Sequence, residues 1–186
     1  VNSYVLSAWS HIYRRDFLIE NNLTFVSERK VGSEDFLFNL EALCFAKKVY
    51  AANDACYYYD LRFGSLTQKY RELLPKQYVN LYRSYMKFIE NSHVRNKHID
   101  EFQNMFLWQL IFGTCFPNEY RKTENHSVAD GRVRVKEICG INEVHTIARN
   151  QLKTAKKPIK ILYLLAFVFK QEWIFFWIFV GKKKNS

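Results

Sequence analysis

The chain has 186 residues, of which 48% are hydrophobic, so it can bury a sizeable core and a largely disordered protein is excluded. The formal net charge is +10, and residues 146–186 hold nine basic residues against one acidic residue. Nucleic acid or an anionic membrane is the partner that such a charge suggests. Because the charge is concentrated beside a Trp- and Phe-rich tail, a lipid surface is favoured over nucleic acid, whose binding face we expect to be spread over the folded body.

The first seventy residues have the pattern of mixed α/β structure. The β-branched and aromatic run YVLSAWSHIY (4–13) indicates a strand, and RRDFLIENN (14–22) indicates a short helix that ends at its asparagines. Thr24 and Phe25 resume an extended course, and KVYAAND (48–54) and ACYYYDLR (55–62) predict two short strands, in a hairpin or side by side in a mixed sheet. The chain opens at Val1 within such an apolar run, so we expect the natural protein to begin further upstream.

A helix is predicted between these strands. From Ser33 onward, apolar residues recur at three- and four-residue spacing, and Lys47 and Lys48 close the pattern at the negative end of the helix dipole. Ser33 is a favourable N-cap, and Glu34 and Asp35 in the first turn are stabilised by the dipole. The same position would keep a carboxylate ionised and exposed, as a general base requires. Helix capping and catalysis are both compatible with this segment.

The loop RFGSLTQ (62–68) is a second candidate site. Arg62, Gly64 and Ser65 could hold a phosphate through the guanidinium group, the backbone N–H groups and the hydroxyl, although loops of this composition are common. No histidine has metal-ligand spacing with a cysteine or an acid, and no D-x-D motif occurs. The dispersed cysteines indicate buried free thiols in a reducing compartment: Cys44, Cys56, Cys115 and Cys139.

The rest of the chain is predicted to be helical, over 75–92, 96–116 and weaker stretches to residue 157. In the tail, 161–180 has the length of a membrane span, but Lys170, Gln171 and Glu172 stand at its midpoint. Charges there cost a few kcal/mol each, and neither apolar half reaches the roughly 20 residues of a span. Binding in the plane of a membrane surface is therefore favoured. The alternative is a helical hairpin packed on the protein's own core.

The order of these elements resembles the second half of bacterial family 2 glycosyltransferases. In that family, a Trp-x-x-(Leu/Ile)-Tyr-x-(Lys/Arg) segment is followed by a helix that starts with Glu-Asp-Phe. A Tyr-Tyr-Tyr strand and an Arg-x-Gly-Ser loop come next. This chain has all four elements in this order between residues 7 and 70. The resemblance implies an α/β fold, here an α-rich fragment with the C-terminal half of a GT-A mixed sheet. It implies an acceptor-side half of the catalytic domain at 1–70, a helical region at 71–157 and a membrane-associated segment at 158–186.

The resemblance also implies roles for individual residues. Asp35 would be the general base, and Glu34 would shape the acceptor site. Trp9 and Tyr13 would line the sugar or acceptor pocket. The leaving diphosphate would lie near Arg62, Gly64 and Ser65. The expected reaction is inverting transfer from a nucleotide-diphosphate sugar to a hydroxyl of a glycan or lipid-linked acceptor, in bacterial surface polysaccharide synthesis. A divalent metal, Mg or Mn, would be held by residues outside this chain.

The same family usually works at the inner face of the cell membrane, so the resemblance implies a cytoplasmic, peripheral location with the tail on the membrane surface and no nucleic-acid partner. An alternative from another class is a non-catalytic basic module that docks on an anionic membrane or on nucleic acid. An upstream nucleotide-binding half with a D-x-D motif would distinguish the transferase from this module.

Overall fold

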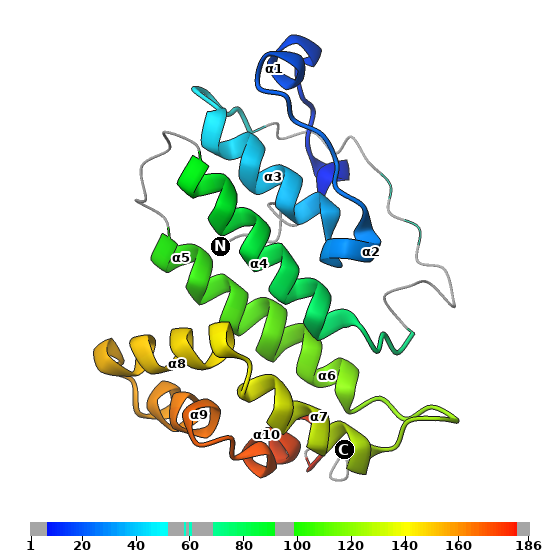
Figure 1. Ribbon diagram of the computed structural model, residues 1–186, viewed down its shortest axis with the longest axis vertical. Helices are drawn as coiled ribbons and strands as arrows, with labels where there is room; N and C mark the ends of the chain where they lie inside the picture. Colours follow the sequence, from blue (N-terminus) through cyan, green and yellow to red (C-terminus); the bar gives the residue numbers. More distant parts are fainter. Residues whose placement is uncertain (1–6, 52–57, 59, 61–68, 92–98, 182–186) are drawn as a thin grey trace. The chain divides into compact units, whose positions relative to one another are not determined.

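A computed structural model describes residues 7–51, 58, 60, 69–91 and 99–181 (Figure 1). The chain divides into two units, one of residues 1–69 and 76–97, the other of residues 70–75 and 98–186. The fold is helical, with 71% of the described residues in helices and 1% in strands. Each unit is built around its own set of buried apolar side chains.

The first unit centres on two helices that pack side by side, α3 (Glu34–Phe45) and α4 (Leu74–Asn91), whose first two residues belong to the other unit. The Cys44 thiol lies 3.5 Å from the Tyr85 hydroxyl, and the Phe45 and Phe88 rings meet edge to face at 5.5 Å. The short helices of this unit are η2 (Ala8–Ser10), α1 (Arg15–Glu20) and α2 (Glu28–Val31).

Helix α2 ends at Gly32, whose backbone is left-handed (φ 73°), a conformation that glycine adopts without the steric cost of a Cβ. A Cβ at this position would also come within 2.9 Å of the Cβ of Gln77 on α4. The Gln77 amide in turn donates to the Arg29 carbonyl at 3.0 Å. Gly32 therefore lets α2 lie against α4 and turns the chain into α3.

The predicted α/β mixed sheet is wrong for the part of the chain that the structure describes, which contains no sheet. The predicted first strand gives way to the 3₁₀ turn η2 in its described part, and residues 48–51 carry no strand pairing. The rest of the two strands predicted over 48–62 lies outside the described residues, except for Tyr58 and Asp60, which are in no strand. Thr24 and Phe25 do lie outside helices, but the Phe25 ring stacks on Phe38 of α3 at 4.1 Å. An extended segment becomes a strand only when a neighbour pairs with its N–H and C=O groups, and here side-chain packing on a helix replaces that pairing.

In the second unit, three helical segments run on as one continuous helix (Figure 1): α5 (Ile99–Met105), the π-helix η5 (Phe106–Cys115) and α6 (Phe116–Glu119). The predicted helix over 96–116 is therefore present in its described part, and it extends to Glu119. The π-helical section is unusual for its length, because π-helices are mostly single-turn bulges. Its apolar face is buried, with Phe106, Leu107 and Ile111 fully enclosed.

Helix α7 (Val128–Cys139) begins with a capping box, in which the Ser127 hydroxyl accepts from the Asp130 N–H and the Asp130 carboxylate accepts from the Ser127 N–H. It crosses α6 closely at Gly131, where a Cβ would come within 2.0 Å of the Glu119 carbonyl oxygen. Only glycine permits this approach of two backbones. The crossing brings Arg134 within 2.6 Å of the buried Glu119 carboxylate.

The tail forms the last helices, α9 (Pro158–Val168) and α10 (Glu172–Phe179), after α8 (Asn142–Thr154). They make a hairpin that packs on the core of their own unit through Leu164, Phe167 and Phe175, which are fully buried. The polar residues at its midpoint form the turn, where Lys170 adopts a left-handed backbone (φ 54°). None of the helices within the described ranges combines the length and the hydropathy that a membrane span requires.

Candidate functional site

The carboxylate of Asp35 is held at the start of α3 by a segment far away in sequence. Its Oδ2 atom accepts a hydrogen bond of 3.1 Å from the backbone N–H of Ala8, 27 residues earlier. Asp35 and its neighbour Glu34 are both half-buried and both lie in the first turn of α3. The helix dipole favours negative charge there, and the N–H of Ala8 fixes the direction of the Asp35 carboxylate.

The predicted capping role of Ser33 is only partly present. Ser33 occupies the N-cap position, but its side chain makes no capping hydrogen bond. At the other end α3 stops at Phe45, so Lys47 and Lys48 follow the helix rather than close its last turn. The acidic residues therefore stand at a helix start whose serine does not satisfy the backbone donors, and the Asp35 side chain is directed to Ala8 instead.

Trp9 lies beside this contact, because it follows Ala8 within η2. Its indole is 47% exposed, although large aromatic side chains are usually well covered in a folded domain. The turn is stabilised by the Ser10 hydroxyl, which donates to the Ser7 carbonyl at 2.8 Å. The structure thus brings an exposed aromatic surface and two half-buried carboxylates to the same end of α3.

Tyr13 belongs to the same assembly but points into the protein. Its hydroxyl donates a hydrogen bond to Asn39 Oδ1, and its ring meets Phe38 edge to face at 5.2 Å. Burial, and secondarily the charge of Asp35, raises the pKa of the Tyr13 hydroxyl to about 12. Tyr13 therefore anchors the segment that carries Trp9 to the side of α3.

Sequence reasoning missed two residues of this cluster. Asn39 is 1% exposed on an otherwise apolar helix face, one turn after Asp35. A polar residue one turn after an acidic residue on such a face could have indicated that the two belong to one cluster. The His11 ring stacks against Tyr13 with centroids 5.8 Å apart, and its Nδ1 lies 3.1 Å from the Ser7 carbonyl oxygen. The spacing of His11 from other polar residues along the chain gave no indication that its ring stacks on Tyr13.

The predicted phosphate loop, with Arg62, Gly64 and Ser65, lies outside the described residues. Cys56 lies outside them as well, while the three cysteines that the structure describes are free thiols, as predicted, with Cys115 and Cys139 buried and Cys44 half-buried. No group of three or more potential metal ligands occurs in the described ranges. The structure therefore brings together four of the predicted residues: Trp9, Tyr13, Glu34 and Asp35.

This arrangement suits proton transfer at an exposed hydroxyl. The Asp35 carboxylate is accessible to solvent and has one oxygen oriented by the backbone N–H of Ala8. The next residue, Trp9, has an exposed indole on which a sugar could stack. Comparisons of the chain with models of protein families, with curated proteins and with solved structures found no significant match to any of them.

Proposed function

We propose that this chain carries the general-base half of an inverting glycosyltransferase that uses a nucleotide-diphosphate sugar. The observation that carries the proposal is the hydrogen bond from the Ala8 N–H to Asp35 Oδ2. It joins the Trp-containing segment to the Glu-Asp-Phe helix start, two elements whose order along the chain resembles family 2 glycosyltransferases. The proposal concerns the chemistry of this cluster and does not depend on a mixed sheet around it.

In the proposed mechanism, Asp35 accepts the proton of the acceptor hydroxyl as the oxygen attacks the anomeric carbon of the donor. The new C–O bond forms on one face of the sugar, while the bond to the diphosphate breaks on the opposite face, which inverts the configuration. Trp9 offers a stacking surface for the acceptor, and Glu34 shapes its site. Tyr13 and Asn39 are positioning residues that keep Trp9 beside the carboxylate.

The donor side of the reaction would come from outside this chain. The implied divalent metal, Mg or Mn, would neutralise charge on the leaving diphosphate, and its ligands are expected upstream. The described residues supply no ligand set for it. For this reason we expect the isolated chain neither to bind a nucleotide sugar tightly nor to transfer sugar, and measurable turnover by it would contradict this division of the site.

The direct test uses the complete protein with its upstream half. Asp35→Asn should lower transfer by about 10² to 10⁴-fold, the usual contribution of a positioned acid or base, and leave donor affinity unchanged. Glu41→Gln is a matched control, because Glu41 is also a half-buried acid on α3, six residues further along. Near-normal transfer by Asp35→Asn would remove Asp35 from the mechanism and favour the non-catalytic docking module.

A further inference from the structure

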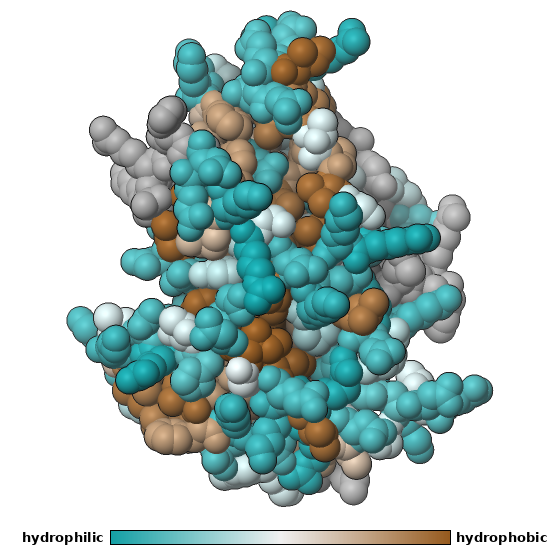
Figure 2. All heavy atoms as spheres, viewed as in Figure 1, coloured by the Kyte–Doolittle hydropathy of each residue, from teal (hydrophilic) through white to brown (hydrophobic). Residues whose placement is uncertain are grey.

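The exposed apolar residues of the second unit gather on the tail hairpin. Trp173 and Trp177 are 50% and 63% exposed, and they stand one helical turn apart on α10, so they share a face. Figure 2 shows apolar side chains gathered over α9 on the face in view. Large side chains are also exposed at the turn and along α9: Phe169, Ile159 and Leu162. Patches of this kind mark interaction sites on proteins.

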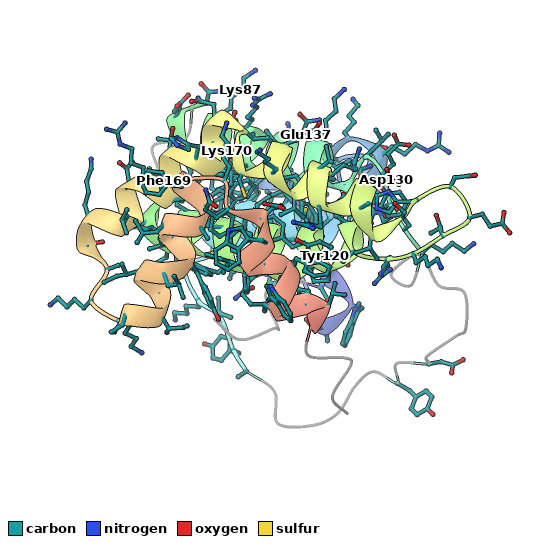
Figure 3. All side chains as sticks on the ribbon, turned by 90° about the horizontal axis from the view of Figure 1, so that it is seen from below. Lys87, Tyr120, Asp130, Glu137, Phe169 and Lys170 are labelled. Carbon is teal, nitrogen blue, oxygen red and sulfur yellow. The ribbon has the colours of Figure 1, made fainter. Side chains whose placement is uncertain are left out.

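This exposure does not come from a loosely attached helix, because α7 holds the hairpin at its turn. The Arg132 guanidinium donates to Glu172 Oε1 at 2.6 Å and lies over the Phe176 ring at 5.2 Å. Lys170, labelled with Phe169 at the turn in Figure 3, extends to the C-terminal end of α7, where its Nζ would lie 3.0 Å from a Cβ on Gly140. A cation is favoured at that end of a helix dipole.

The midpoint charges of the tail thus make contacts within the protein, as does Lys160 of α9, which donates to Asn104 Oδ1 at 3.3 Å. Lys156 and Lys157 precede α9 and are exposed, and Lys182, Lys183 and Lys184 follow α10 in the sequence. The Trp177 indole covers the backbone at Gly181, where a Cβ would come 2.4 Å from its Cε3 atom. Exposed lysines therefore stand before α9, and exposed tryptophans stand on α10 of the same hairpin.

We propose that the α9–α10 hairpin docks as a folded unit on an anionic phospholipid surface. Trp173 and Trp177 would lie at the level of the headgroups, where amphipathic aromatic rings are favoured, and the exposed Lys156 and Lys157 would bind the anionic lipids. The indole N–H of Trp173 already donates to Gln171 Oε1 at 2.9 Å, so burial of this ring leaves no unpaired donor. This differs from a single in-plane helix, because the buried faces of α9 and α10 stay packed on the core.

The test is sedimentation of the full 186-residue chain with vesicles of phosphatidylcholine alone or mixed with phosphatidylglycerol. We expect binding only to the mixed vesicles, weakened by added salt. Replacement of the exposed pair Lys156 and Lys157 by Ala should weaken it roughly 25-fold, since each nearby lysine contributes about a factor of five. The same change at the exposed pair Lys47 and Lys48 should have no effect.

The aromatic contribution is tested by Trp173→Ala with Trp177→Ala, which should weaken binding about tenfold or more. Tyr50→Ala removes an aromatic ring that is 86% exposed on the first unit, and it should bind as the parent chain does. Quenching of tryptophan fluorescence by brominated lipid gives a second measurement on the unaltered chain, and the quenching should disappear in the double variant.

Several results would overturn the proposal. Equal binding to both vesicle types, or binding by the double Trp variant at the parent level, would exclude this surface. A dimer that forms without vesicles and dissociates in the Trp variant would make the face an interface between two copies. Binding to a DNA duplex that exceeds binding to the mixed vesicles would assign the lysines to nucleic acid. None of these readouts depends on sugar transfer, so the proposed catalytic function stands or fails separately.

Discussion

The guanidinium of Arg134 donates to the carboxylate of Glu119 at 2.6 Å, and the Glu119 side chain is completely buried. The same Arg134 donates to the Glu72 carbonyl, while the Asn118 side chain pairs with both the N–H and the C=O of Arg71. The segment that leads into α4 is thus held by polar contacts with α6 and α7. Because the carboxylate is shielded from water, its partner is required for stability.

We expect Arg134→Met to lower the free energy of unfolding by about 3 kcal/mol, because it leaves a buried carboxylate without its counter-charge. Arg132→Met is the matched control. Its bond to Glu172 is equally short, but both side chains are partly exposed, so the loss should be about 1 kcal/mol or less. Denaturant titration of the two variants measures the difference, and equal losses would contradict the importance of burial.

Gly131→Ala should destabilise the chain by about 3 kcal/mol, since its Cβ would overlap the Glu119 carbonyl and force α6 and α7 apart. Gly140→Ala is the comparison, because the nearest atom there is the flexible end of Lys170 at 3.0 Å. Thermal unfolding followed by circular dichroism distinguishes them. An unchanged melting temperature for Gly131→Ala would show that the two helices do not cross this closely.

Stability should fall at alkaline pH. Burial, with a smaller contribution from neighbouring acids, raises the pKa of Tyr13 and of Tyr70 to about 12, from the usual value of 10.0. Between these values the unfolded chain loses protons that the folded chain keeps, so the stabilisation is complete below pH 10 and is lost as the pH rises toward 12. Unfolding free energies measured across this range should decline less steeply in Tyr13→Phe than in the parent.

The buried thiols should react slowly. Burial raises the pKa of Cys139 to about 12 and raises that of Cys115 well above its ordinary value, and alkylation requires the thiolate. We expect iodoacetamide at neutral pH to leave both residues unmodified in the folded chain and to modify them in denaturant. Peptide mapping by mass spectrometry gives the extent at each site. Rapid labelling of Cys115 in the folded chain would mean that its enclosure opens readily.

The spacing of apolar residues predicted the helices, but it could not show whether an extended segment has a neighbouring strand to pair with. The spacing of apolar residues after Ser33 placed α3 correctly, because a helix closes its hydrogen bonds within its own sequence. Strand formation depends on a distant neighbour, so the aromatic run ending in Trp9 and Tyr13 was misread, and its described part packs on α3. The cluster itself was half predictable: Asp35 is visible from its helix start, whereas its contact with Ala8 is tertiary and leaves no trace in spacing.

The tail shows a similar limit. Its lysines and tryptophans were evident from composition, and the polar residues at its midpoint argued against a single membrane span. In-plane binding to a membrane surface was the favoured interpretation, whereas the described residues form the alternative, a helical hairpin packed on the protein's own core. That Arg132 pairs with Glu172 depends on how α7 and α10 meet, which no local pattern encodes. The hairpin alternative describes how these helices pack, and association with a membrane remains a separate prediction.

The π-helical section Phe106–Cys115 determines in which direction around the helix axis the side chains of the following helix α6 point. Its hydrogen bonds span five residues rather than four, so each residue rotates the chain by less than the 100° of an α-helix. The directions of Asn118 and Glu119 around the helix axis therefore depend on the number of residues in this section. Deleting one of them would rotate both side chains away from Arg71 and Arg134, although neither residue had been altered. The length of this section therefore determines whether the contacts of Asn118 with Arg71 and of Glu119 with Arg134 can form together.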